Sequence, residues 1–224
     1  MAYDYAGSWD STAGHQSNLF RSHSNPQSTP FSTEAAVSHY RSQGVDARKI
    51  VLGMPIYGRA FENTEGAGKG YQGVGEGTWE NGVFDYKKLP LEGSREFLDR
   101  EVGASGCFDE GRRKLVSYDT VEMARWKAEY IKKEGLGGAM VCVSFFLPSI
   151  ISSIFPGCYW TGNREKRKVL MQTQWWESSA DKTGDQSLIT NVVDVLGKGE
   201  LDKKQNCLTY PHSKYDNVRK GFED

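Results

Sequence analysis

The stretch KIVLGMPIYG, Lys49 to Gly58, carries no charge after its first residue and is apolar almost throughout. A continuous apolar run of this length is typical of a strand that is buried on both faces of a parallel sheet. Upstream, Thr33 to Gly44 has the spacing and the end signals of a helix, and Met1 to Tyr5 has the pattern of a short strand. The order strand, helix, strand predicts a βα repeat and therefore an α/β fold.

The remaining pattern continues this α/β order. A strand is expected at Leu115 to Asp119, and Thr120 then caps an amphipathic helix that runs to Lys133. GLGGAM, Gly135 to Met140, begins the next buried strand, and the last helix is expected at Gln186 to Leu196. The apolar faces expected for the first two helices are Ala35, Ala36, Val37 and Tyr40, and Val121, Ala124, Ala128 and Ile131.

Residues 59–116 differ in composition from the rest of the chain. Glycines recur between Gly66 and Gly82, and they are interleaved with Tyr71, Trp79 and Phe84. A phosphate-binding loop would join a buried strand directly to a helix, and no helical pattern follows these glycines. The region is therefore interpreted as a small inserted α+β subdomain with tight turns.

Charge and cysteine content exclude several classes of function. The formal net charge is −1, which does not favour a nucleic acid or an anionic membrane surface as a partner. The four cysteines, Cys107, Cys142, Cys158 and Cys207, show no C-x-x-C spacing, so neither a zinc site nor a disulfide framework is predicted. No metal and no cofactor is expected.

Three stretches together resemble one enzyme family. MAYDYAGSWD at residues 1–10, IVLGMPIYGRAF at 50–61 and WWESSADKTGDQSLI at 175–189 resemble the sixth, seventh and eighth strand regions of glycoside hydrolase family 18 chitinases, in particular the fungal enzymes of bacterial type. The resemblance implies the last three strands of a (β/α)8 TIM barrel, with the family's chitinase insertion subdomain at 59–116. The remaining residues, 1–58 and 117–224, would then belong to the barrel.

The resemblance also implies an activity. Family members are endo-acting glycosidases that hydrolyse β-1,4-linked N-acetylglucosamine in chitin, with retention of configuration. A glutamic acid protonates the glycosidic oxygen while the sugar's own N-acetyl carbonyl attacks the anomeric carbon, which is an exception to the usual two-carboxylate scheme. Chitin or chito-oligosaccharides are the implied partners, and an extracellular monomer is the implied state.

The matching residues fall at the ends of the expected strands, where barrel enzymes carry their active sites. By resemblance, the Tyr3 hydroxyl is catalytic and holds the N-acetyl oxygen for attack. Asp4 would accept hydrogen bonds from sugar hydroxyls, and Arg59 would donate to a hydroxyl or a carbonyl. The implied substrate-binding residues are Met1, Asp4, Trp9, Tyr57, Arg59 and Trp176, with Trp176 as the floor under the sugar and Trp9 as a stacking platform.

One part of the family pattern is missing. The catalytic signature D-x-x-D-x-D-x-E, whose last residue is the proton donor, occurs nowhere in the sequence, and FLDREVG around Asp99 and Glu101 lacks its spacing. The first residues have neither the basic nor the apolar region of a signal peptide, so we expect the chain to begin inside a domain, without strands one to five. The chain alone is expected to be inactive. An alternative is a lectin-like protein of the same fold that binds sugar through Trp9, Trp176 and Arg59.

Residues 141–174 interrupt the family pattern, and three interpretations stand. The segment is uncharged up to Asn163 and then basic, as in a membrane-spanning helix, but it contains Pro148 and Pro156 and lies inside an expected barrel strand. It could form a lid over the cleft. The third interpretation, translated intron sequence, fits best: removal joins Met140 to Trp175 and restores GLGGAMWWESSAD, and GTATGT and CAG codons would supply the splice ends.

Overall fold

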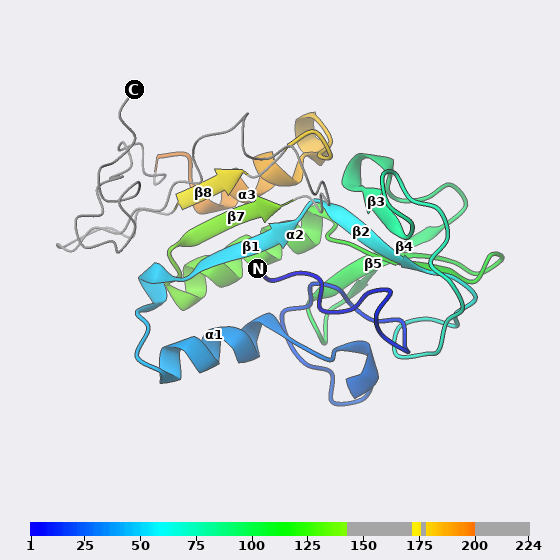
Figure 1. Ribbon diagram of the computed structural model, residues 1–224. Helices are drawn as coiled ribbons and strands as arrows, with labels where there is room; N and C mark the ends of the chain where they lie inside the picture. Colours follow the sequence, from blue (N-terminus) through cyan, green and yellow to red (C-terminus); the bar gives the residue numbers. More distant parts are fainter. Residues whose placement is uncertain (143–171, 176–177, 200–224) are drawn as a thin grey trace, which may run out of the picture. The chain divides into compact units, whose positions relative to one another are not determined.

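The computed structural model describes residues 1–142, 172–175 and 178–199 (Figure 1). All of them belong to one compact unit of the chain. The described strands form two sheets, a three-stranded parallel sheet in the order β1-β7-β8 and a five-stranded antiparallel sheet in the order β3-β2-β6-β5-β4. The fold of the described part is therefore mixed α/β.

The α-helices are α1 (Thr33–Ser42), α2 (Val121–Glu134) and α3 (Leu188–Leu196), and the 3-10 turns are η1 (Pro26–Ser28), η2 (Ala47–Lys49), η3 (Tyr86–Lys88) and η4 (Gly184–Gln186). The strands are β1 (Val51–Pro55), β2 (Tyr57–Phe61), β3 (Val83–Asp85), β4 (Arg95–Asp99), β5 (Ala104–Asp109), β6 (Lys114–Ser117), β7 (Gly138–Cys142) and β8 (Gln172–Trp175).

The apolar run at 49–58 forms parts of two strands rather than one. β1 pairs in parallel with β7, whereas β2 turns away after Ile56 and pairs antiparallel with β3 and β6. The expectation of one continuous strand was wrong. Pro55 lies at the division, and because proline has no backbone N–H it cannot continue the donor side of a ladder.

Met1 to Tyr5 does not form the expected strand. The segment lies beside β1 and makes one backbone hydrogen bond to it, from Ala2 N to Gly53 O at 3.0 Å. Asp4 has a φ of +60°, in the left-handed region. A strand requires extended backbone at every residue, so the conformation of Asp4 ends the extended segment after three residues.

The two helices predicted from end signals are present. Ser32 caps α1, and only Thr33 and Val37 of that helix are buried, whereas Ala35, Ala36 and Tyr40 are exposed. The predicted apolar face of α1 was therefore right at Val37 and wrong at Ala35, Ala36 and Tyr40, because the helix packs by a narrow stripe spaced four residues apart.

The prediction for α2 is confirmed. Thr120 accepts a hydrogen bond from Met123 N, and Gly135 ends the helix with a φ of +64°. Ala124, Ala128 and Ile131 are buried, and the helix packs against β7 and α3. The last helix, α3, begins two residues later than expected, because Ser187 caps it and Gln186 belongs to η4.

The Gly-rich region forms the antiparallel sheet. Residues 59–116 are all described, and the only helical element among them is the 3-10 turn η3, so the expected α+β subdomain is a β-sheet subdomain. Its sheet begins at Tyr57 and ends at Ser117, slightly outside the predicted bounds. The division of the chain at 58 and 116 remains a prediction.

Strands β7 and β8 include the two ends of the segment that interrupts the family pattern, residues 141–142 and 172–174. They pair in parallel, with Met140 opposite Gln174 and Val141 opposite Trp175. Residues 143–171 lie outside the described part, so the interpretation of residues 141–174 stays a prediction. Within the described residues, no helix has the length and apolar character needed to span a membrane.

Candidate active site

Asp4 is the centre of a charged cluster at the start of β2. The Tyr57 hydroxyl donates to Asp4 Oδ1 at 2.5 Å, and Arg59 Nε donates to the same oxygen at 2.6 Å. Tyr57 and Arg59 are two residues apart on one strand, so their side chains leave the same face of the sheet. The left-handed conformation of Asp4 turns the chain at the point where its carboxylate meets them.

Arg59 is a fixed cation. Its side chain is only 8% exposed, against 35% for Asp4. Burial alone lowers the pKa of Arg59. The hydrogen bond to Asp4 and the charge of Asp4, with smaller charge effects from Tyr57 and Glu80, outweigh burial and raise that pKa above its ordinary value. The guanidinium therefore remains charged at every working pH and holds a defined orientation.

Trp9 extends the cluster toward solvent. The Arg59 Cζ atom lies 4.7 Å from the centroid of the Trp9 ring and 5.7 Å from that of Tyr57, in the range of cation–π contacts. The ring rests over Gly7, where an added Cβ would lie 2.4 Å from Trp9 Cη2. More than half of Trp9, 58%, is exposed, which leaves a flat apolar surface beside a hydrogen-bonding centre.

Tyr3 and Met1 complete the cluster on the side of β1. The Tyr3 ring meets the Tyr57 ring edge to face, with centroids 6.2 Å apart. Gly53 makes this approach feasible: a Cβ there would lie 3.1 Å from both Met1 Cα and Tyr3 Cε1, and 3.2 Å from Met140 Cε. A larger residue at Gly53 would push the tyrosine away from β1.

The structure brings together six of the seven residues that the sequence predicted: Met1, Tyr3, Asp4, Trp9, Tyr57 and Arg59. Trp176 lies outside the described residues. Among the described residues, no group of three or more His, Cys, Asp or Glu side chains could hold a metal ion.

Sequence reasoning missed Trp79, which belongs to the same surface. Its Nε1 donates to both carboxylate oxygens of the buried Asp85 at 3.1 Å, and Asp85 lies opposite Tyr57 in the β2–β3 register. The rest of Trp79 is largely exposed. The sequence showed an aromatic among glycines, but only the strand register places that aromatic near Tyr57.

The loop that carries Trp9 is anchored at its base. Asp10 Oδ2 accepts from Gly7 N at 2.8 Å, and the Tyr71 hydroxyl donates to the Asp10 carbonyl at 2.8 Å. Tyr71 in turn stacks edge to face on the buried Phe61, with centroids 4.9 Å apart. The Trp9 platform is thus fixed to the β-sheet subdomain.

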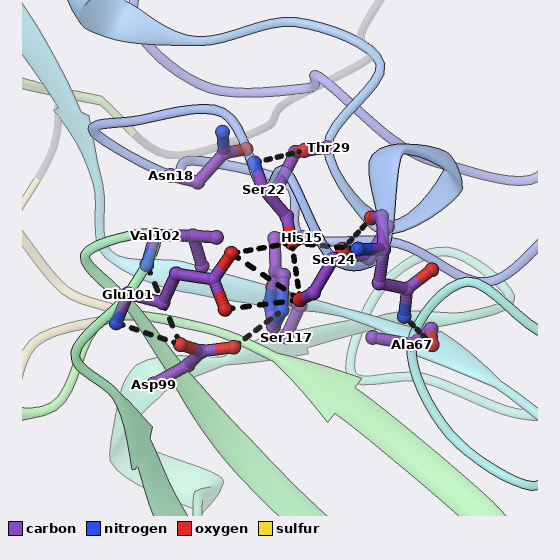
Figure 2. Close-up of polar contacts among 12 residues, drawn as sticks. His15, Asn18, Ser22, Ser24, Thr29, Ala67, Asp99, Glu101, Val102 and Ser117 are labelled. Atoms are coloured by element: carbon purple, nitrogen blue, oxygen red, sulfur yellow. Dashed lines mark hydrogen bonds and ion pairs between the residues drawn. The ribbon is translucent and has the colours of Figure 1, made fainter.

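Figure 2 shows a second anchor farther along this loop. Glu101 Oε1 accepts from Ser22 Oγ at 2.9 Å, and Glu101 Oε2 accepts from Ser24 Oγ at 3.0 Å. Asp99 Oδ1 accepts from the Glu101 backbone N at 3.0 Å, and the buried His15 Nε2 lies 3.8 Å from Asp99 Oδ2. These two carboxylates therefore hold the loop on the β-sheet subdomain.

His15 is held neutral in this anchor. Its burial lowers its pKa to about 4, the nearby charge of Asp99 acts against that shift, and Lys127 adds to it. A buried imidazole next to a single carboxylate at 3.8 Å gains too little to offset the loss of hydration.

The chemistry of the cluster suits a neutral polyhydroxylated ligand. A carboxylate accepts from hydroxyl groups, a fixed guanidinium and the Tyr3 phenol can donate, and an exposed indole offers a face to a sugar ring. Among the described residues, Asp4 Oδ2 receives no hydrogen bond, so it can accept one from a ligand.

Comparison with known proteins gives a consistent result. Residues 1–142 match the family model described as Glycosyl hydrolases family 18. Chitinase 1 of Aphanocladium album is 43% identical over 222 residues, which cover 99% of this chain and 44% of that protein. The chain thus spans less than half the length of this curated relative.

Solved structures agree with this match. The catalytic domain of psychrophilic chitinase B from Arthrobacter TAD20 superposes with a TM-score of 0.61 at 27% identity, over 88% of this chain and 37% of that one. A mutant GH18 chitinase from Cycas revoluta, in complex with (GlcNAc)4, gives 0.55 at 25% identity, over 64% of this chain and 41% of that one.

Proposed function

The chain belongs to glycosyl hydrolase family 18, and we propose that it is the substrate-binding part of a chitinase that acts on β-1,4-linked N-acetylglucosamine. The observation that carries this proposal is the cluster of Asp4, Tyr57 and Arg59 beneath the exposed Trp9. It combines fixed hydrogen-bonding groups with an aromatic platform, in a chain whose relatives are named chitinases.

We propose that the described part supplies the last three strands of a (β/α)8 barrel. The segment Met1–Asp4, although it is not a regular strand here, would take the place of the sixth strand, with β1 as the seventh, β7 as the eighth and β2 to β6 as the insertion subdomain. The parallel pairing of β1 with β7 and the hydrogen bond from Ala2 to Gly53 support this order. So does the share of the Arthrobacter domain that the chain covers, 37%.

The proposed mechanism is substrate-assisted retention. The Tyr3 hydroxyl would hold the N-acetyl oxygen for attack on the anomeric carbon and stabilise the charge that develops on it. Its edge contact with Tyr57 fixes the ring on one side. Asp4 would accept from a sugar hydroxyl, Arg59 would donate, and Trp9 and Trp79 would stack on sugar faces.

The general acid of this mechanism is not found in the chain. Because the family signature that ends in the proton-donating glutamate is absent from the sequence, we propose that the chain alone binds chito-oligosaccharides without cleaving them. The same absence favours the alternative function, a carbohydrate-binding protein of the same fold. An extracellular location and a monomeric state remain predictions from the family resemblance.

We infer that residues 141–174 do not belong to the functional fold. Without them Trp175 would follow Met140 and occupy the position of Val141, which pairs with Met54 of β1. The strand that begins at Gly138 would then continue directly from Met140 into Trp175, as in the family pattern.

Calorimetric titration with (GlcNAc)4 tests the proposal. We expect saturable binding to the whole chain and no binding of cellotetraose, whose glucose units lack the N-acetyl group. Equal affinity for both oligosaccharides, or binding of neither, would contradict an N-acetylglucosamine site.

A further inference from the structure

Gln16 connects the two halves of the proposed site. The residue is fully buried, and its Nε2 donates to the Tyr57 carbonyl at 2.8 Å and to the Ser117 carbonyl at 3.1 Å. Its backbone carbonyl accepts from Tyr5 N at 2.9 Å, and its backbone N donates to Ser117 Oγ at 3.0 Å. One residue thus links the segment after Asp4, the start of β2 and the end of β6.

These contacts act on the two partners of one short hydrogen bond. Tyr5 directly follows Asp4, and Tyr57 carries the hydroxyl that donates to the Asp4 carboxylate at 2.5 Å. The backbone on both sides of that bond is therefore held by Gln16. The Tyr57 ring also borders Tyr3, so a shift of Tyr57 would change the place of the proposed catalytic hydroxyl.

We propose that Gln16 is a positioning residue, which sets the spacing between Asp4 and Tyr57 and, through Tyr57, the orientation of Tyr3. This inference rests on the proposed function for its ligand, although the positioning itself does not. A neutral primary amide suits this buried position, since its NH2 group donates one hydrogen bond to the Tyr57 carbonyl and one to the Ser117 carbonyl. A carboxylate at this position would face those oxygens without a proton to donate.

Binding measurements with (GlcNAc)4 test the proposal. Gln16→Leu removes two neutral hydrogen bonds next to the site, so we expect the Kd to rise about tenfold. Ser117→Ala is the matched control: it removes the acceptor of the Gln16 backbone N–H but leaves the amide on Tyr57, and its Kd should stay within about twofold of the wild type. Equal Kd values for folded Gln16→Leu and wild type would overturn the inference.

A double-mutant cycle separates positioning from general loosening. If Gln16 acts in part through the Tyr57 hydroxyl, then Gln16→Leu and Tyr57→Phe together should cost less affinity than their separate effects multiplied, because that hydroxyl is already gone while the ring beside Tyr3 remains. Independent, multiplying effects of the two substitutions would contradict this route. The pairing of Gln16→Leu with Glu101→Gln, which alters the remote loop anchor, should show such independence.

A measurement without ligand separates this inference from the proposed function. The Arg59 Nε–H signal in a ¹⁵N NMR spectrum should exchange with solvent more than about fivefold faster in Gln16→Leu than in Ser117→Ala, because the ion pair with Asp4 loosens. If the wild type fails to bind (GlcNAc)4, the proposed function falls and this comparison still decides the role of Gln16. An unchanged exchange rate would refute it.

A further measurement uses a variant that retains Gln16, so that the inference can be tested even if the Gln16 variants do not fold. In Tyr57→Phe, the side-chain amide signals of Gln16 should move, since the coupling runs both ways. Signals that stay at their wild-type positions would show that Gln16 and the Tyr57 hydroxyl are not coupled.

Discussion

Arg59 and Asp4 form a charged hydrogen bond in which Arg59 Nε lies 2.6 Å from Asp4 Oδ1. The pair joins a residue of the first segment to a strand of the antiparallel sheet, 55 positions later in the chain. The nearly buried guanidinium depends on this carboxylate, because an unpaired charge in that environment is costly.

Loss of the pair should reduce stability. Asp4→Ala leaves Arg59 without its acceptor, so we expect the free energy of unfolding to fall by about 2 kcal/mol. Glu134→Gln is the matched control, since it breaks the Arg41–Glu134 pair, whose side chains are 49% and 28% exposed, and it should cost less than about 1 kcal/mol. Urea denaturation measures both, and equal losses would show that Arg59 does not rely on Asp4.

Trp9 should contribute to sugar binding through its exposed face. Trp9→Ala removes the platform above Arg59, and we expect the affinity for (GlcNAc)4 to fall about tenfold. Phe31, which is similarly exposed, serves as the control: Phe31→Ala should leave the affinity unchanged. Trp9→Phe should recover part of the loss. A normal affinity for Trp9→Ala would remove Trp9 from the site.

His15 should make the protein sensitive to acid. The folded state keeps His15 neutral down to about pH 4, whereas the unfolded chain gains a proton near pH 6.5. The unfolded state therefore binds more protons in this window, and stability falls as the pH drops through it, by roughly 3 kcal/mol from this residue. His15→Gln should flatten this part of the stability curve relative to wild type, and the exposed His39→Gln should follow the wild type. Parallel curves for His15→Gln and wild type in denaturation between pH 6.5 and 4 would contradict the account.

Deletion of residues 141–174 should make the protein more soluble. Because the uncharged run from Val141 to Trp160 was, on the intron interpretation, never selected to pack, its removal should raise the soluble, monomeric fraction seen by size-exclusion chromatography. Sequencing of mature messenger RNA checks the cause. Transcripts that retain these codons at a high fraction would contradict the intron interpretation.

Local signals in the sequence were enough to predict α2, whereas the candidate site residues came from the family resemblance. Thr120 and Gly135 mark the ends of α2: the Thr120 side chain accepts from Met123 N, and the Gly135 backbone N–H donates to the carbonyls of Ile131 and Lys132. The site residues were found because three motifs resemble one family. None of this depended on long-range packing.

Features that depend on tertiary contacts were not predicted. The division of the apolar run between two sheets depends on pairing partners far along the chain, and Pro55 was the one local sign of it. Nothing in the sequence around Asp4 indicated that its backbone adopts the left-handed conformation. Gln16 and Trp79 gain their roles from contacts to Tyr57 and Asp85, which no spacing rule connects.

We propose that this chain carries the sugar-binding residues of a chitinase site and lacks the proton donor. Turnover of a fluorogenic chitobioside tests it most directly, with the chain alone beside a fusion in which Met140 is joined to Trp175 and the upstream half of Chitinase 1 of Aphanocladium album precedes Met1. We predict no turnover above a heat-inactivated control for the chain alone and clear turnover for the fusion. In the fusion, Tyr3→Phe should lower kcat about 10²-fold. Turnover by the chain alone, or a fusion that folds and binds (GlcNAc)4 but stays inactive, would contradict the claim.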